Sequence, residues 1–179
     1  MNNINNELIQ KLKIDYNNKK EKIKSRLQEF QDFCNKPLSW FYRDNEMKLM
    51  PVDTDDNHRI FEELSFCIFT ANTSAEMGLR AVDATRNVLI NGTPDEMKRR
   101  LDGIYRFNNV RPQYILHTRN YLKDTIDFEL KNKIDSFNDK EDLRQFFAEN
   151  KGIKGIGMKE ASHFLRNIGF KGYAILDKH

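Results

Sequence analysis

The 179-residue sequence contains little cysteine, glycine or proline, and each scarcity excludes a class of protein. Its two cysteines, Cys34 and Cys67, cannot form a disulfide framework, and they cannot supply the four thiolates of a zinc site or an iron–sulfur cluster. Eight glycines and four prolines exclude collagen-like and low-complexity classes. Because His58, His117 and His179 share no ligand spacing, we expect neither a metal nor a cofactor.

Long apolar runs are also missing. No segment approaches the ~20 apolar residues of a membrane-spanning helix. Residues 1–6 lack the apolar segment of a signal peptide. We therefore expect a cytoplasmic protein that has no membrane partner.

The positive charge of the chain is concentrated near its end. The formal net charge is only +3, which is too close to balance to indicate nucleic-acid binding by itself. Residues 1–150 carry a net charge of −1 and residues 151–179 a net charge of +4. The basic segment could be a solvated tail or a surface that meets phosphate.

Helical signals recur along the chain, whereas sustained alternation of apolar and polar residues is absent. Helices are predicted over residues 8–33, 59–70, 75–90, 110–122 and 143–150, with a further helix that starts at Thr93, an N-cap at Asn138 and another helix after the glycines of residues 155–157. Thr93, Pro94 and Glu96 form a strong helix-start signal. We therefore predict an all-α fold.

Residues 34–57 are predicted to form a loop that Trp40, Phe41 and Tyr42 anchor to the core. This loop suggests a division into residues 1–56, a helix and loop packed on the core, and a main domain of residues 57–179.

The most informative segment is residues 153–165, in which Gly155 and Gly157 flank Ile156. Glycine permits a tight turn and close approach of the backbone to a ligand. The N-terminus of the following helix presents unpaired N–H groups and a positive dipole end, so the two features together form a seat for phosphate. We expect Ile156 to plug into the core. Two glycines alone would more often mark a helix end and a turn, but the flanking apolar helices resemble a helix-hairpin-helix motif, which holds the DNA backbone.

Lys159 lies in the first turn of this second helix, where lysine is disfavoured. The dipole end and partial burial both lower the pKa of a lysine, which suits it to nucleophilic attack and Schiff-base formation. Asp177 follows 18 residues later, a spacing that allows the chain to turn back toward Lys159. A surface lysine and a surface aspartate are the ordinary alternatives.

The string from Lys154 to Asn167, followed by Asp-Lys-His at residues 177–179, resembles the type 2 (archaeal-type) 8-oxoguanine DNA glycosylase/lyase family, within the helix-hairpin-helix glycosylases. The segment Phe66–Glu76 resembles the helix–break–helix of these enzymes. The resemblance covers residues 57–179 well. It implies two helical lobes around a cleft and a monomeric enzyme that removes 8-oxoguanine from double-stranded DNA and nicks the abasic site.

The resemblance also implies roles for individual residues. Lys159 would be the Schiff-base nucleophile and Asp177 the catalytic carboxylate. Asn72 would approach the gap left by the extruded base, and Phe107 would stack on that base, although a core aromatic is an equal alternative there. Four residues would bind the DNA backbone: Lys154, Gly155, Ile156 and Gly157. His163 is expected to be a helix-face residue without a catalytic role.

Family members continue beyond Asp-Lys-His with helices that close the cleft and end in a lysine. We therefore expect this chain to be a partial sequence. Two other functions remain open: a non-catalytic helix-hairpin-helix DNA-binding module, and a sister glycosylase that acts on oxidised pyrimidines. Lys159 argues against an adenine-excising relative.

Overall fold

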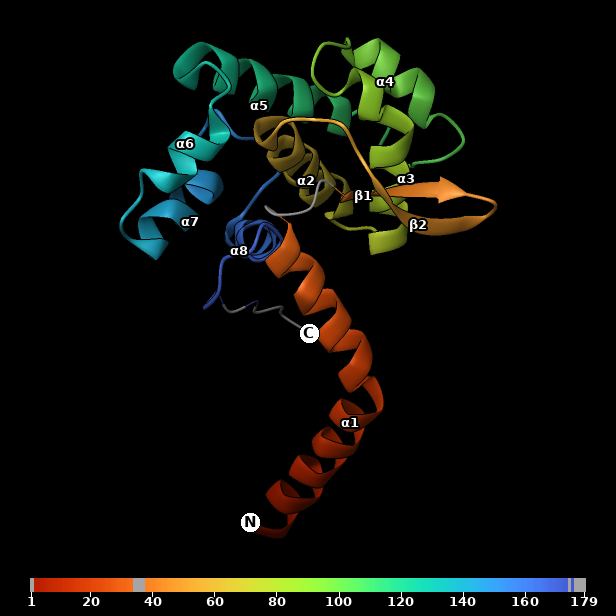
Figure 1. Cartoon of the computed structure of the whole chain (residues 1–179), viewed down its shortest axis with the longest axis vertical. Helices are drawn as coiled ribbons and strands as arrows, with labels where there is room; N and C mark the ends of the chain where they lie inside the picture. Colours follow the sequence, from red (N-terminus) through yellow and green to blue (C-terminus); the bar gives the residue numbers. More distant parts are fainter. Residues whose placement is uncertain (1, 34–37, 174, 176–179) are drawn as a thin grey trace.

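The computed structural model describes residues 2–33, 38–173 and 175, and it is dominated by helices (Figure 1). The elements, in chain order, are α1 (Asn2–Asp32), β1 (Leu38–Arg43), β2 (Glu46–Pro51), α2 (Asp56–Thr70), α3 (Ala75–Thr85), the short 3-10 helix η1 (Arg86–Val88), α4 (Pro94–Leu101), α5 (Arg111–Ile126), α6 (Leu130–Asp135), α7 (Lys140–Glu149) and α8 (Met158–Asn167). Within the described residues, none of these helices combines the length and apolar character that a membrane span requires.

Helix α2 is the centre of the fold, and it contacts α3, α5, α6 and α8. Its sequence explains this position, because apolar side chains occupy almost every direction around the helix. Phe61, Leu64, Ile68 and Phe69 are all fully buried. Helix α1 instead extends away from the body of the molecule (Figure 1).

Helix starts follow local side-chain chemistry. Thr93 and Glu96 form the predicted capping box at the start of α4, in which each residue bonds the backbone N–H of the other. Helix α7 begins one residue later than predicted, because Asp139 rather than Asn138 accepts the N–H groups at its start. The predicted helix of residues 75–90 ends earlier, since α3 stops at Thr85 and η1 follows. Helix α6 has no counterpart among the predicted elements.

The prediction of a loop over residues 34–57 is wrong in part. Strands β1 and β2 form an antiparallel hairpin in which Leu38 pairs with Pro51 and Arg43 with Glu46. Asp44 and Asn45 close it with φ values of 55° and 62°. This left-handed pair matches the right-handed twist of a two-residue hairpin, and Asp and Asn tolerate it well.

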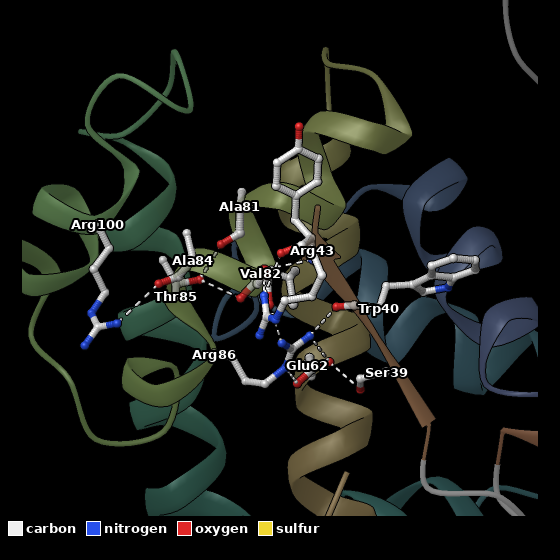
Figure 2. A network of polar contacts seen from close by, with 12 residues as sticks. Ser39, Trp40, Arg43, Glu62, Ala81, Val82, Ala84, Thr85, Arg86 and Arg100 are labelled. Atoms are coloured by element: carbon white, nitrogen blue, oxygen red, sulfur yellow. Dashed lines mark hydrogen bonds and ion pairs between the residues drawn. The ribbon is translucent and has the colours of Figure 1, made fainter. Parts of the chain in front are cut away.

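Arg86 fixes the hairpin to α2 and α3 (Figure 2). Its guanidinium donates hydrogen bonds to Glu62 of α2 at 2.9 Å, to Asp83 at 2.7 Å and to the Trp40 carbonyl oxygen at 2.6 Å. It also lies 3.9 Å from the centre of the Phe41 ring. The prediction that the aromatic residues anchor this segment to the core is wrong, because none of them is part of the core cluster and Arg86 instead holds the hairpin through the Trp40 carbonyl and the Phe41 ring.

Candidate active site

The turn between α7 and α8 has the predicted shape of a helix-hairpin-helix. Ile156 is buried, as predicted, and fixes the turn to the core. Gly155 has a φ of +80°, and a Cβ there would lie 2.8 Å from the Tyr114 ring. The turn is also bonded to α5, because the Lys154 N–H donates to the Thr118 hydroxyl at 2.9 Å, while the Lys154 side chain is exposed. Position 155 requires glycine because of its positive φ and its close approach to Tyr114.

Gly157 differs from Gly155, because its φ of −109° is ordinary extended backbone. It is the N-cap residue of α8, and its N–H donates to Glu160 Oε2 at 3.3 Å. Its importance lies in its small size and in this backbone N–H. The sequence analysis expects the backbone N–H groups at the start of α8 to bind phosphate. In the structure, the Glu160 carboxylate accepts the hydrogen bond of one of them, the Gly157 N–H.

A cavity of about 350 Å³ lies between α2 and α8, two helices that lie in contact near the centre of the molecule (Figure 1). We call it the α2–α8 cavity. Lys159 lines it from the first turn of α8, and Ala71 and Thr73 line it from the break between α2 and α3. Lys159 Nζ lies 3.7 Å from Glu160 Oε1. The structure therefore brings the predicted nucleophile to the predicted helix–break–helix.

Asn72 lies between two cavity-lining residues but is itself exposed, with a left-handed φ of 62°. Its carbonyl oxygen accepts a 2.5 Å hydrogen bond from Arg106, and the carbonyl of Ala71 accepts one of 3.0 Å from Arg111. Both arginines belong to the segment that carries Phe107. The structure therefore brings Asn72 and the Phe107 turn together.

Tyr105 and Phe107 differ in burial, although both pack against the core. Tyr105 is the core aromatic, since it is buried and its hydroxyl donates to the Phe69 carbonyl at 2.5 Å. This burial raises the pKa of Tyr105 above its usual range. Phe107 is half-buried, with the guanidinium groups of Arg106 and Arg111 at 4.4 and 5.5 Å from its ring centre. Its stacking on a base remains a prediction.

A polar network that the sequence analysis missed forms one wall of the α2–α8 cavity. Asn167 donates to Glu63 of α2 at 2.5 Å, Arg166 donates to Asn167 Oδ1 at 3.2 Å, and the same Arg166 nitrogen lies 3.1 Å from His163 Nδ1. His163, Arg166 and Asn167 all line the cavity. The sequence could have placed His163 in the cavity. It lies four residues after Lys159 in the same helix, and residues i and i+4 share a helix face.

Several predicted residues lie outside the described part of the chain. Asp177, the predicted catalytic carboxylate, is one of them, and Cys34 is another. Cys67 is buried in α2, as predicted, and it also lines the cavity. Within residues 2–33, 38–173 and 175, no three His, Cys, Asp or Glu side chains form a group that could hold a metal ion.

Comparison with solved structures places this fold among helix-hairpin-helix DNA glycosylases. The Methanocaldococcus jannaschii 8-oxoguanine DNA glycosylase matches 99% of this chain and 71% of its own, with a TM-score of 0.72 and 32% identity. The same archaeon's glycosylase/lyase in complex with a 15mer DNA containing 8-oxoguanine matches 96% of this chain and 71% of its own, with a TM-score of 0.73 and 34% identity.

Sequence comparisons are more specific. The family model for 8-oxoguanine DNA glycosylase matches residues 41–179. The 8-oxoguanine DNA glycosylase/AP lyase of Thermoplasma volcanium is 42% identical over 75% of this chain and 61% of its own length. That of Methanocaldococcus jannaschii is 35% identical over 89% of this chain and 65% of its own. The chain thus spans less than two thirds of these relatives, and it belongs to the 8-oxoguanine DNA glycosylase family.

Proposed function

We propose that this protein removes 8-oxoguanine from double-stranded DNA and then cleaves the strand at the abasic site, acting as a monomer inside the cell. The observation that carries the proposal is the position of Lys159 in the α2–α8 cavity, opposite the break between α2 and α3. A base cannot react at its sugar bond while it is stacked in a duplex, so it must be extruded into such a cavity.

Lys159 performs the covalent chemistry in this proposal. Its neutral amine attacks C1′, a C–N bond forms, and the bond from C1′ to the base breaks as the base leaves with the electron pair and takes up a proton. The sugar ring then opens as a proton moves from the lysine nitrogen to O4′, which gives a Schiff base. Removal of a C2′ proton expels the 3′ phosphate by β-elimination. Asp177 would stabilise the positive charge that develops on the sugar.

The α7–α8 turn would hold the DNA backbone. Lys154 supplies an exposed positive charge, while Gly155 and Gly157 allow phosphate to approach the start of α8. Ile156 contributes by fixing this turn to the core. These contacts carry no sequence information, so they suit an enzyme that must scan undamaged DNA.

The damaged nucleotide would also be contacted from the break between α2 and α3 and from the turn that carries Phe107. The turn that carries Phe107 is bonded to the break that carries Asn72, through Arg106 and Arg111. This arrangement supports a stacking role for Phe107 and a gap-filling role for Asn72, because it holds the two segments next to each other.

Borohydride trapping on a duplex with a single 8-oxoguanine tests the proposal. The full chain should form a covalent protein–DNA product, whereas Lys159→Ala and Lys159→Gln should form none and still bind DNA. Lys98→Ala, which removes an exposed lysine of α4, is the matched control and should trap normally. Binding without trapping by the wild-type chain would favour the non-catalytic module. Trapping on an oxidised pyrimidine but not on 8-oxoguanine would favour the sister glycosylase.

A further inference from the structure

The carboxylate of Glu160 makes two different contacts with its two oxygens. Oε2 accepts the Gly157 N–H at 3.3 Å, and Oε1 lies 3.7 Å from Lys159 Nζ. The side chain of Glu160 is 23% exposed and that of Lys159 is 39% exposed, so the pair is only partly hydrated. The bond to the backbone orients the carboxylate, and the second oxygen faces the amine.

The same capping arrangement at α4 shows that a helix start does not require this second contact. There, Glu96 Oε2 accepts both the Thr93 N–H at 2.7 Å and the Thr93 hydroxyl at 3.0 Å. At α8 the N-cap is Gly157, which has no hydroxyl. At α8 the second oxygen of Glu160 lies toward the neighbouring lysine amine.

Glu160 is also the one carboxylate among the described residues that line the α2–α8 cavity. The other titratable or charged groups of that lining are Cys67 from α2, and His163 and Arg166 from α8. The described break between α2 and α3 contributes Ala71 and Thr73, which carry no charge. The Glu160 carboxylate places its Oε1 3.7 Å from the lysine amine, so an anionic oxygen lies at the nucleophile.

We propose that Glu160 is the proton acceptor that converts Lys159 from an ammonium to the nucleophilic amine. This inference rests on the proposed function. In the step, one proton passes from Lys159 Nζ to Glu160 Oε1, so that an ammonium and a carboxylate become an amine and a carboxylic acid. The amine then attacks C1′. The departing base anion takes up one proton, which balances the one that Glu160 received and restores the carboxylate.

Glu160→Gln tests this role, because glutamine keeps an oxygen that accepts the Gly157 N–H but removes the negative charge. The assay is single-turnover borohydride trapping by the full chain on a duplex with a pre-formed abasic site, followed from acid to alkaline pH. Near pH 7, trapping should fall about 100-fold, the scale of a positioned general base. The deficit should close as the pH rises into the alkaline range, where the amine loses its proton unaided.

Two variants separate proton transfer from structure. Glu96→Gln alters the corresponding cap of α4 and should keep the wild-type pH profile, even where its unfolding midpoint is lower. Glu160→Asp retains a carboxylate, so it should trap more slowly than the wild type but keep the wild-type pH dependence. It supplies the test if Glu160→Gln does not fold.

Equal or faster trapping by Glu160→Gln across the pH range would overturn the proposal, because the carboxylate would then only hold the lysine as an ammonium. A pH profile of Glu160→Asp that shows the same alkaline recovery as Glu160→Gln would overturn it as well. Failure of the wild-type chain to trap any substrate would instead be the failure of the proposed function.

Discussion

Gly155 is the position where a single added methyl group should disturb both folding and DNA binding. Its φ of +80° is unfavourable for other residues, and a Cβ would meet Tyr114 at 2.8 Å. We expect Gly155→Ala to lower the free energy of unfolding by about 3 kcal/mol, which combines backbone strain with crowding. Binding to damaged and undamaged duplexes should weaken alike, measured by fluorescence anisotropy at fixed salt.

Gly103 provides the control for Gly155. It has a similar φ of +69°, but nothing lies within 4 Å of its Cβ position. Gly103→Ala should therefore show the backbone strain alone, about 1 kcal/mol in urea denaturation. Equal losses for the two variants would mean that the contact with Tyr114 yields easily, and unchanged affinity of Gly155→Ala for undamaged DNA would remove this turn from the DNA interface.

At the scale of single residues, the sequence singled out Lys159 as the candidate nucleophile but did not predict the contacts around it. Lys159 and the residues of the α2–α3 break could be proposed as site residues because they lie in recognisable local patterns, and the structure brings them to one cavity. The bond between Asn167 and Glu63 joins residues 104 positions apart, and such a pairing depends on how α2 packs on α8. Glu160 follows Lys159 in the same sequence motif, but its contacts with the lysine amine and with the Gly157 N–H could be recognised only in the structure.

Among the helices, α4 offers the clearest test of a start signal. Thr93→Ala removes the hydroxyl that accepts the Glu96 N–H at 3.2 Å. The free energy of unfolding should fall by about 1 kcal/mol, the usual cost of losing such a cap. Lys98→Ala, on an exposed site of the same helix, should change it little. Urea denaturation measures both, and equal effects would show that the cap contributes no more than helix propensity.

The capping box also predicts a dependence on pH. The hydrogen bonds that Thr93 donates lower the pKa of Glu96 below its ordinary value of 4.5. A carboxyl group with a lower pKa in the folded state stabilises the fold above its unfolded pKa and loses that effect as pH falls through its folded pKa. Glu96→Gln should therefore be less stable than the wild type at pH 7, and the difference should narrow below pH 4.5. A constant difference would exclude titration of Glu96 as the cause.

The hairpin shows why some elements escaped prediction from sequence. Its first strand carries three consecutive aromatic residues rather than an alternating pattern, and its second strand is largely exposed. Its stabilising contacts come from distant residues, among them Arg86, which bonds the Trp40 carbonyl from more than 40 residues later in the chain. Helix starts, in contrast, are encoded within four residues, so the capping box at Thr93 was predicted correctly.

For the molecule as a whole, Arg86 determines whether the hairpin stays docked. Arg86→Gln removes the cation shared by Glu62 and Asp83, both largely buried, and should cost about 3 kcal/mol of unfolding free energy. Hydrogen exchange of the amides of residues 38–51 should accelerate. Arg43→Gln, whose ion pair with Asp83 is half exposed, should cost less than about 1 kcal/mol. Unchanged exchange in Arg86→Gln would mean that other contacts hold the hairpin.

The first part of α1 should be dispensable for the stability of the body. Residues 6–19 are all exposed, including Leu8, Leu12 and Tyr16. Deletion of residues 1–20 should therefore change the urea midpoint of the body by no more than the equivalent of about 0.5 kcal/mol. The cut leaves Phe33, which stacks with Arg59 at 4.3 Å, in the chain. A larger loss would reveal that this part of α1 stabilises the body.

The two arginines that bond the carbonyl groups directly after α2 also shape the electric field that an approaching polyanion meets. A helix C-terminus carries partial negative charge and would repel phosphate. Arg106 and Arg111 place two cations on the carbonyl groups of Asn72 and Ala71, directly after α2. These cations should offset the repulsion that the end of α2 would otherwise exert on a phosphate backbone. Encounter with DNA should be accelerated by their positive charge, and the association rate should fall steeply as ionic strength rises.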